Sequence, residues 1–413
     1  MLTRQGWAVL IGAGVAAAAG RLFALAELYV VAAALAALVG SAAVSVRRRT
    51  LRLRVGREVS PRRVHAGTPA RVELRVGNGG RFPTPVLRLH DPVTGTRGAT
   101  VLFAPIEPEG RVRSAYRLPT ERRGVLAVGP LDVSVEDPFG LARLRTVGAP
   151  VAELTVLPRV DEIRPPPPAG GDEPLAGARV TVAAAHAGDD FAALRGYVVG
   201  DDMRRVHWPS SARHDDLLVR QDEVHWQGRT TVVLDLRRSA HGTDGGPSLE
   251  AAVSAAASVV AASWRRGDLV RLLTTDGLDT GHGAGAGHVE AVLERLATVG
   301  VTNHGSLAAV AASLARDGSG GLVAVLGLVG PTDLKAVAEL RARFGSLTLV
   351  RVDAAAWGVA TTGATAALTD AGGVVGAVVT GPDQPFAPAW DQAMIARGAA
   401  RRRAGGGRAG VLR

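Results

Sequence analysis

The sequence predicts three structural parts: an N-terminal transmembrane helical hairpin, a small antiparallel β-sandwich and an α/β doubly wound domain. Three observations carry this prediction. Two long apolar runs stand at the N-terminus, and short alternating segments separated by turn residues follow them. Apolar strand-like runs then alternate with helical patterns toward the C-terminus. A chain of 413 residues is long enough for such a multi-domain arrangement.

The two apolar runs have the length and composition of membrane spans. They cover residues 7–25 and 27–46, with a turn expected near Gly20, Arg21 and Leu22. A span needs about 20 apolar residues, so we predict a hairpin over residues 1–49. A cleaved signal peptide is the alternative for the first run. The hairpin is favoured because the second run follows at once and ends in an arginine cluster typical of a stop-transfer signal.

That cluster predicts the orientation of the chain. It consists of Arg47, Arg48, Arg49, Arg52 and Arg54. Arginines that flank a span stay in the cytoplasm under the positive-inside rule. With two spans, the N-terminus and the soluble head are then cytoplasmic too. We therefore expect a multi-pass protein of the cell (inner or plasma) membrane that contacts the lipid bilayer.

Residues 50–163 have the pattern of short β-strands. Polar and apolar residues alternate in Arg71–Val76, glycines mark a turn at 77–80, and similar runs follow at 86–89, 112–118, 124–128, 131–135 and 154–157. Short strands without intervening helices predict a small antiparallel sandwich, and we favour a structural spacer role for it. Residues 164–179 begin with a run of prolines and then glycines, which predicts an extended linker.

From Thr230 onward, strand-like and helical patterns alternate. The strand runs are 231–236, 268–275, 321–329, 346–352 and 374–379, and helical segments lie between them and at 388–397. Near-continuous apolar strands predict a doubly wound parallel sheet within residues 180–396. Ligands of such sheets bind at the carboxyl ends of the strands. Residues 397–413, rich in Arg, Gly and Ala, predict a disordered basic tail.

The densest polar block lies just before this sheet. Its candidate partner-binding or structural residues are Arg195, Tyr197, Gly200, Asp201, Asp202, Arg204, Arg205, His207, Trp208, Ser211, Ala212 and Arg213. Guanidinium groups and carboxylates pair bidentately, and tryptophan offers a large apolar face with a polar handle. The block predicts either ion pairs that fix this segment on the sheet or a charged face for a partner.

This block resembles the signature of the DUF58 family, in which R-x-Y-x-x-G-D-x-x-R-x-x-x-W-x-x-S-A-R precedes a von Willebrand factor A-like domain. The match runs from Arg195 to Arg213, and Leu218–Arg220 and Asp235 also fit. The paired apolar runs, His65–Gly67 and Asp137–Leu141 resemble the family's N-terminal half. The resemblance covers nearly the whole chain. It implies a bacterial membrane protein with a cytoplasmic head, associated with MoxR-type AAA+ ATPases and without a settled biochemical activity.

The resemblance also implies a place for a divalent cation. A von Willebrand A domain binds one through D-x-S-x-S after the first strand, with a Thr and an Asp on later loops, and such oxygen ligands suit Mg²⁺. Asp235 and Ser239 match, and Thr302 is the candidate loop threonine. Arg237 replaces the middle serine, and Gly327 stands where the aspartate is expected. A guanidinium repels a cation and could instead pair with Asp235, so we expect no cofactor, with a degenerate Mg²⁺ site as the alternative.

The favoured function is non-enzymatic: a membrane-anchored adaptor or scaffold that docks a cytoplasmic partner such as a MoxR-type ATPase. No Walker, H-E-x-x-H or G-x-S-x-G motif occurs, and the absence of cysteine excludes cysteine nucleophiles. The alternative is a cell-envelope-associated hydrolase that uses His207 with Asp201 or Asp202 as an acid–base pair. A weaker alternative is nucleic-acid binding by the basic tail, since the net charge is +10. We expect no nucleic-acid partner because the arginine clusters are not interleaved with aromatics.

Overall fold

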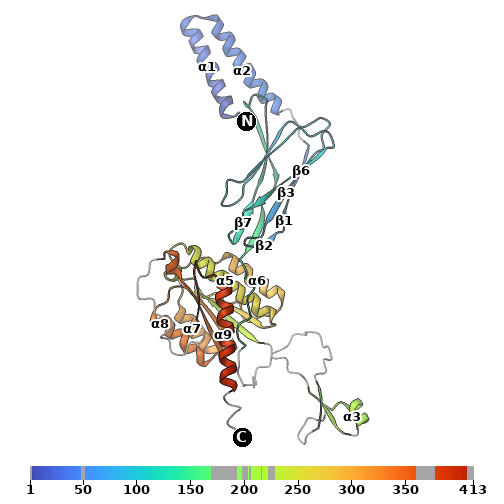
Figure 1. Cartoon of the computed structure of the whole chain (residues 1–413). Helices are drawn as coiled ribbons and strands as arrows, with labels where there is room; N and C mark the ends of the chain where they lie inside the picture. Colours follow the sequence, from blue (N-terminus) through green and yellow to red (C-terminus); the bar gives the residue numbers. More distant parts are fainter. Residues whose placement is uncertain are drawn as a thin grey trace. The chain divides into compact units, whose positions relative to one another are not determined.

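The computed structural model describes residues 2–47, 52–168, 193–197, 203, 206–214, 216–221, 228–359 and 377–406 (Figure 1). The chain divides into two compact units. The first unit holds residues 1–161, and the second holds most of the residues that follow. Each unit has a hydrophobic core of its own.

The first unit begins with two long helices, α1 (Arg4–Phe23) and α2 (Ala26–Arg47), which pack against each other. Both are long and apolar enough to span a membrane. Much of their apolar surface is exposed, as at Ile11 (63%), Leu22 (78%) and Val30 (70%). An exposed apolar surface of this extent is typical of a site that contacts a membrane or another protein.

The turn of the hairpin lies at Ala24 and Leu25, so the prediction of a turn near Gly20–Leu22 is wrong. Ala24 ends α1 in the left-handed region at φ 54°, and the Leu25 N–H donates to the Gly20 carbonyl at 3.0 Å. Gly20 is instead a helical residue where α2 comes close. A Cβ at Gly20 would lie 3.2 Å from side-chain atoms of Leu28 and Tyr29, so this glycine serves packing and not the turn.

The base of the hairpin is fixed to the loop Asp137–Leu141. The Thr3 N–H donates to the Leu141 carbonyl at 2.9 Å, and the Thr3 hydroxyl donates to the Gly140 carbonyl at 2.5 Å. The same hydroxyl accepts the Gly6 N–H at 3.0 Å and so caps α1. The buried Asp137 carboxylate holds the loop in shape, because it accepts the N–H groups of Phe139 (2.9 Å) and Ala142 (2.6 Å).

Gly6 is the point of closest approach between the hairpin and this loop. A Cβ at Gly6 would overlap the carbonyl oxygen of Leu141. Beside it, α2 contributes its own contacts, and a small core forms from Val39, Ala42, Val46, Leu141 and Ala142. The hairpin is therefore held by hydrogen bonds at α1 and by apolar packing at α2.

The described strands between residues 52 and 161, called the β module below, form three small sheets around one core. Their order is β1-β3-β6, β2-β10-β7 and β5-β4-β8-β9. The strands are β1 (Leu53–Ser60), β2 (Arg63–His65), β3 (Ala70–Asn78), β4 (Leu87–Asp91), β5 (Ala99–Phe103), β6 (Arg111–Leu118), β7 (Gly124–Val128), β8 (Leu131–Glu136), β9 (Arg143–Ala149) and β10 (Ala152–Leu157). The pairings among them are antiparallel apart from β2 with β10. This departs from the purely antiparallel prediction, since the long connection between those two strands allows a parallel pair.

The second unit is built on a sheet of parallel strands in the order β14-β13-β15-β16-β17. Their bounds are β13 (Arg229–Leu234), β14 (Leu269–Thr274), β15 (Gly321–Leu326), β16 (Ser346–Val352) and β17 (Ala377–Thr380). Strands β13, β14, β15 and β16 are almost wholly buried, as continuous apolar runs in a parallel sheet require. The chain passes from β13 to β14 on one side and then to β15 on the other, so the order reverses between β13 and β15.

The described segments between and after these strands form helices. They are α4 (Arg238–His241), α5 (Gly246–Arg265), α6 (Ala286–Thr298), α7 (Leu307–Asp317), α8 (Pro331–Glu339), the short 3₁₀ turns η2 (Leu340–Ala342) and η3 (Ala354–Trp357), and α9 (Phe386–Gly406). Side chains of α7, α8 and η2 share one core with β13, β14, β15 and β16. A separate pair of short strands, β11 (Ala193–Gly196) and β12 (Leu218–Gln221), carries the helix α3 (Trp208–His214).

Two predicted boundaries change. Helix α9 continues to Gly406, so the prediction of a disordered tail is wrong for residues 397–406. Alanine and arginine are strong helix formers, and Arg397 donates to the Thr348 hydroxyl at 2.9 Å. The described start of the predicted linker, residues 164–168, is bonded to the second unit: the buried Trp390 indole donates to the Arg164 carbonyl at 2.8 Å. Residues 169–179 lie outside the described residues.

We expect Gly6→Ala to lower the midpoint of thermal unfolding of the detergent-purified protein, because the new methyl group forces α1 away from Leu141. The matched control is Gly12→Ala, which adds the same methyl group in α1 where nothing lies within 4 Å. On helix propensity alone, both variants would gain stability. Equal midpoints for the two variants would contradict the close contact at Gly6.

Candidate functional site

The candidate site of the second unit lies at the carboxyl ends of β13 and β15, where the strand order reverses. Parallel α/β sheets bind their ligands at this position, because the connecting loops leave in opposite directions and open a crevice. Asp235 directly follows β13 and is fully buried. A buried carboxylate must be paired with a positive charge or coordinate a metal ion, so the partners of Asp235 determine what this edge can bind.

Arg237 neutralises Asp235. Its Nε and Nη2 atoms donate to the two carboxylate oxygens of Asp235, each at 2.9 Å, and its backbone N–H donates to Oδ1 at 3.1 Å. This is the bidentate pairing that arginine and carboxylate geometries favour. The pairing that the sequence suggested for Arg237 is therefore present.

A second carboxylate completes the ion-pair cluster. Asp333, in the first turn of α8, accepts from Nη1 of Arg237 at 3.0 Å. Burial acts to lower the pKa of Arg237, but the hydrogen bond to Asp235 and the two carboxylate charges outweigh it and raise that pKa above its ordinary value. The guanidinium therefore stays charged and occupies the space in front of Asp235.

The residues of this edge do not fit a divalent cation. Both Asp235 oxygens are taken by Arg237, Ser239 is exposed in α4, and Thr302 uses its hydroxyl to accept the His304 N–H at 3.0 Å. Within the described ranges, no three metal-ligating His, Asp or Glu side chains come together. A cation would have to displace a guanidinium that is already bonded twice.

The loop that follows β15 has no room for an aspartate at position 327, where the sequence has glycine. A Cβ at this position would overlap the carbonyl oxygen of Ala240 in α4. The Leu328 N–H donates to that same carbonyl at 3.0 Å. A side chain at position 327 would thus separate two loops that are hydrogen-bonded to each other, so the glycine is a packing requirement.

Sequence reasoning missed three polar residues at this edge. Thr275, after β14, contacts Asp235 Oδ1 at 3.4 Å and accepts the Leu236 N–H at 2.9 Å. His241 is buried between the Ser248 hydroxyl (2.8 Å from Nδ1) and the Asp235 carbonyl (2.9 Å from Nε2), and burial lowers its pKa. A neutral ring satisfies both contacts if Ser248 donates to Nδ1 and Nε2–H donates to the carbonyl.

The DUF58-like segment is described in part. Gly200, Asp201, Asp202, Arg204 and Arg205 lie outside the described residues, and so do the ion pairs predicted for them. The described parts assemble around β12. Arg195 pairs with Val219 across β11 and β12, and the half-buried Tyr197 donates its N–H to the Leu217 carbonyl at 2.7 Å.

Ser211 and His207 have local structural roles in this segment. The buried Ser211 hydroxyl accepts the Leu218 N–H at 2.8 Å and so joins α3 to β12. His207 precedes α3, and its Nδ1 lies 2.8 Å from the Ser210 hydroxyl and accepts the Ser210 N–H at 3.3 Å. This is the geometry of a helix cap, and it gives the imidazole a use other than acid–base chemistry.

Large apolar side chains of the same segment are exposed. Trp208 has 59% of its surface accessible, Met203 has 48% and Leu217 has 37%. Ala212 and Arg213 in α3 are exposed as well. Tryptophan, methionine and arginine, all exposed in this segment, are residue types that are enriched at protein–protein interfaces.

These features define the class of the second unit: a parallel α/β unit whose strand-end carboxylate is neutralised by arginine, with an exposed tryptophan in the short helix α3 between β11 and β12. Residues 193–329 match the family described as "Protein of unknown function DUF58", which supports the DUF58 family for this chain. The match covers the described part of the polar block and the edge that holds Asp235.

Comparisons with curated proteins and with two solved structures show at most weak similarity to this chain. No curated protein matches. A CARDB domain from Pyrococcus furiosus, solved in complex with di-metal ions, is 16% identical over 26% of this chain and 93% of its own, with a TM-score of 0.21. An alkylpurine DNA glycosylase from Pseudomonas fluorescens is 12% identical over 27% of this chain and 32% of its own, with a TM-score of 0.18.

We expect Arg237→Ala to destabilise the protein by about 3–5 kcal/mol, because it leaves the Asp235 carboxylate buried without its partner. The matched control is Arg238→Ala, which removes the next guanidinium along the chain from an exposed position and should change stability by less than about 0.5 kcal/mol. Urea denaturation followed by circular dichroism measures both. Similar midpoints for the two variants would contradict the assignment of Arg237 as the counter-ion of Asp235.

Proposed function

We propose that this protein is a membrane-anchored adaptor of the DUF58 type. Its N-terminal helices span the cell membrane, and its soluble head lies in the cytoplasm. Its second unit, which we propose to be a doubly wound, von Willebrand factor A-like domain, docks a partner such as a MoxR-type AAA+ ATPase. The observation that carries the docking proposal is the exposed Trp208 within the segment that matches the family.

The exposure of Trp208 costs free energy unless a partner covers it. A buried Trp side chain removes roughly 150–250 Å² from water, and tryptophan is among the residues that most often dominate binding energy at interfaces. Met203 and Leu217, exposed in the same segment, add apolar area, and Arg213 supplies charge. The occupant that this composition favours is therefore another protein.

A non-catalytic role fits the chemistry of the described residues. Asp235 has its two oxygens bonded to Arg237, so it offers no free carboxylate for acid–base work. The Nδ1 of His207 is engaged with Ser210 at the start of α3. We favour docking over the hydrolase alternative because the Nδ1 atom of His207 already has a structural use, while Asp201 and Asp202, its predicted acid–base partners, lie outside the described residues.

The membrane anchor rests on the exposed apolar surface of the hairpin. Both helices are long and apolar enough to span a membrane. Many of their apolar side chains are exposed. Arg4 at the start of α1 and Arg47 at the end of α2 lie at the same end of the hairpin. Positive charge at that end favours its retention in the cytoplasm.

We expect Trp208→Ala to weaken binding of the full-length protein to the purified MoxR-type ATPase of the same organism by at least about tenfold. The matched control is Trp264→Ala, which removes another partly exposed tryptophan (38%) from α5. Binding is measured by surface plasmon resonance with the ATPase as analyte. Equal affinities of the two variants, or no binding by the unmodified protein, would contradict the docking proposal.

The topology has a direct test because the chain contains no cysteine. A single Phe23→Cys substitution places a thiol at the exposed hairpin turn, and Glu107→Cys places one on the exposed surface of the β module. In intact spheroplasts, a membrane-impermeant maleimide should label the Phe23→Cys variant and should label the Glu107→Cys variant only after lysis. Labelling of the Glu107→Cys variant in intact spheroplasts would overturn the cytoplasmic head.

A further inference from the structure

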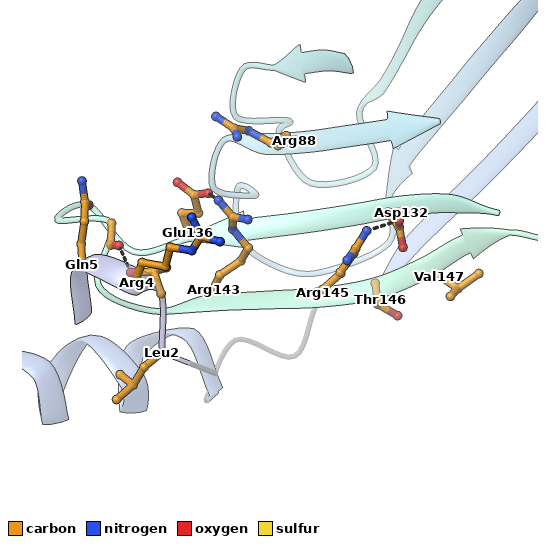
Figure 2. Close-up of a pocket in the computed structure, with 12 residues that line it drawn as sticks. Leu2, Arg4, Gln5, Arg88, Asp132, Glu136, Arg143, Arg145, Thr146 and Val147 are labelled. Carbon is orange, nitrogen blue, oxygen red and sulfur yellow. Dashed lines mark hydrogen bonds and ion pairs between the residues drawn. The ribbon is translucent and has the colours of Figure 1, made fainter. Parts of the chain in front are cut away.

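The first unit contains a pocket that the adaptor role does not use. It lies between the start of the hairpin and the outer face of the sheet β5-β4-β8-β9 (Figure 2). Residues from α1 and its cap form one wall, and residues from β4, β8 and β9 form the other. The hydrogen bonds of Thr3 to Gly140 and Leu141 hold the two walls together.

The strand register places the charged groups of the sheet wall on one face. Arg88 in β4 and Arg145 in β9 both pair with Ser134 in β8, from opposite sides. Their Cα atoms are thus separated by two strand spacings, about 10 Å. Because both residues pair with Ser134, the side chains of Arg88 and Arg145 stand on the same face of the sheet.

The pocket carries more positive than negative charge. Four arginines line it, against two carboxylates. Glu136 pairs with Arg143, and Asp132 pairs with Arg145. Within the described part of the chain, the guanidinium groups of Arg4 and Arg88 have no carboxylate partner, so these two arginines account for the surplus. Figure 2 shows Glu136 and Arg143 near Arg4 at one end, Asp132 and Arg145 at the other, and Arg88 on β4.

An apolar surface begins beside this charged pocket. Arg4 is the first residue of α1, and the exposed side chains of Trp7 (55%), Ile11 (63%) and Val15 (63%) follow on the same helix. Tryptophan one turn from a basic residue is typical of the membrane–water boundary. A ligand that fits both parts has an anionic group for the arginines and a long apolar part for α1.

From this geometry we infer that the pocket binds the head group of an anionic phospholipid, with Arg88 and Arg4 as the principal contacts and the acyl chains along α1. This inference rests on the membrane-anchoring part of the proposed function and not on the docking of a partner. Each arginine near an anionic lipid surface contributes about 1 kcal/mol, which is about a fivefold change in affinity.

The test uses native mass spectrometry of the full-length protein released from detergent micelles. Phosphatidylglycerol and phosphatidylcholine with identical acyl chains are added in equal amounts. The unmodified protein should retain phosphatidylglycerol preferentially, and Arg88→Gln should reduce that preference about fivefold. Arg88 is the better choice for substitution than Arg4, because it lies outside the hairpin and does not enter the charge balance that orients the spans.

Two further variants make the result specific. Arg117→Gln removes an exposed arginine from β6, outside the pocket, and should leave the preference unchanged. Arg88→Lys keeps the positive charge and should retain most of the preference. The inference is overturned if both lipids are retained equally, or if Arg88→Gln and Arg117→Gln behave alike. It is also overturned if inorganic phosphate at the same concentration displaces phosphatidylglycerol, because the pocket would then bind a soluble anion.

Failure of this inference and failure of the proposed function can be told apart. If the cysteine labelling shows that the hairpin spans the membrane while Arg88→Gln leaves lipid retention unchanged, only the lipid pocket is wrong. If the Glu107→Cys variant is labelled in intact spheroplasts, the proposed cytoplasmic topology is wrong, whatever the result for lipid retention. Loss of partner binding in the Trp208→Ala variant has no bearing on lipid retention.

Discussion

The first unit depends on the close contact between α1 and the loop Asp137–Leu141. Two backbone-directed hydrogen bonds from Thr3 and the absence of a side chain at Gly6 allow that contact. Asp137 keeps the loop in shape from the other side by accepting two N–H groups. Because α2 packs on the same loop through Val39, Ala42 and Val46, the hairpin is held at both of its helices. A hairpin fixed in this way has a defined orientation relative to the β module, whereas one attached by a single flexible link would not.

The second unit is organised by a different constraint, the buried charge of Asp235. A buried carboxylate must be paired, and in this chain the partner is a guanidinium from two residues along the same loop. The same guanidinium reaches Asp333 at the start of α8, so one side chain links the loops that follow β13 and β15. A bound divalent cation could dissociate from this edge, whereas the guanidinium of Arg237 is covalently attached and always present. The Asp235–Arg237 pair therefore keeps this edge formed without a cation.

The sequence predicts the interior of this fold better than its edges, for physical reasons. Runs such as 231–236 and 346–352 are recognisable because parallel strands buried on both faces are continuously apolar. The Asp235–Arg237 pair is also predictable, since it is formed within three residues. The turn of the hairpin lies beyond its predicted position because Gly20 serves helix packing. Part of the predicted tail is helical because arginine and alanine have high helix propensity, which composition alone does not express. Thr275 reaches Asp235 where Thr302 was expected, because which loop comes close depends on how β14 lies beside β13 and not on any local pattern.

Charge at the base of the hairpin connects the topology with the inferred lipid pocket. Under the proposed topology, the arginines at this end of the hairpin lie beside the anionic head groups of the inner leaflet. Arg4 takes part in both effects, because it begins α1 and also lines the pocket. Arg88 takes part in one only, since it belongs to β4 and reaches the pocket through the fold. The two effects are therefore separable by substitution, because Arg4 belongs to both the hairpin and the pocket whereas Arg88 belongs to the pocket alone.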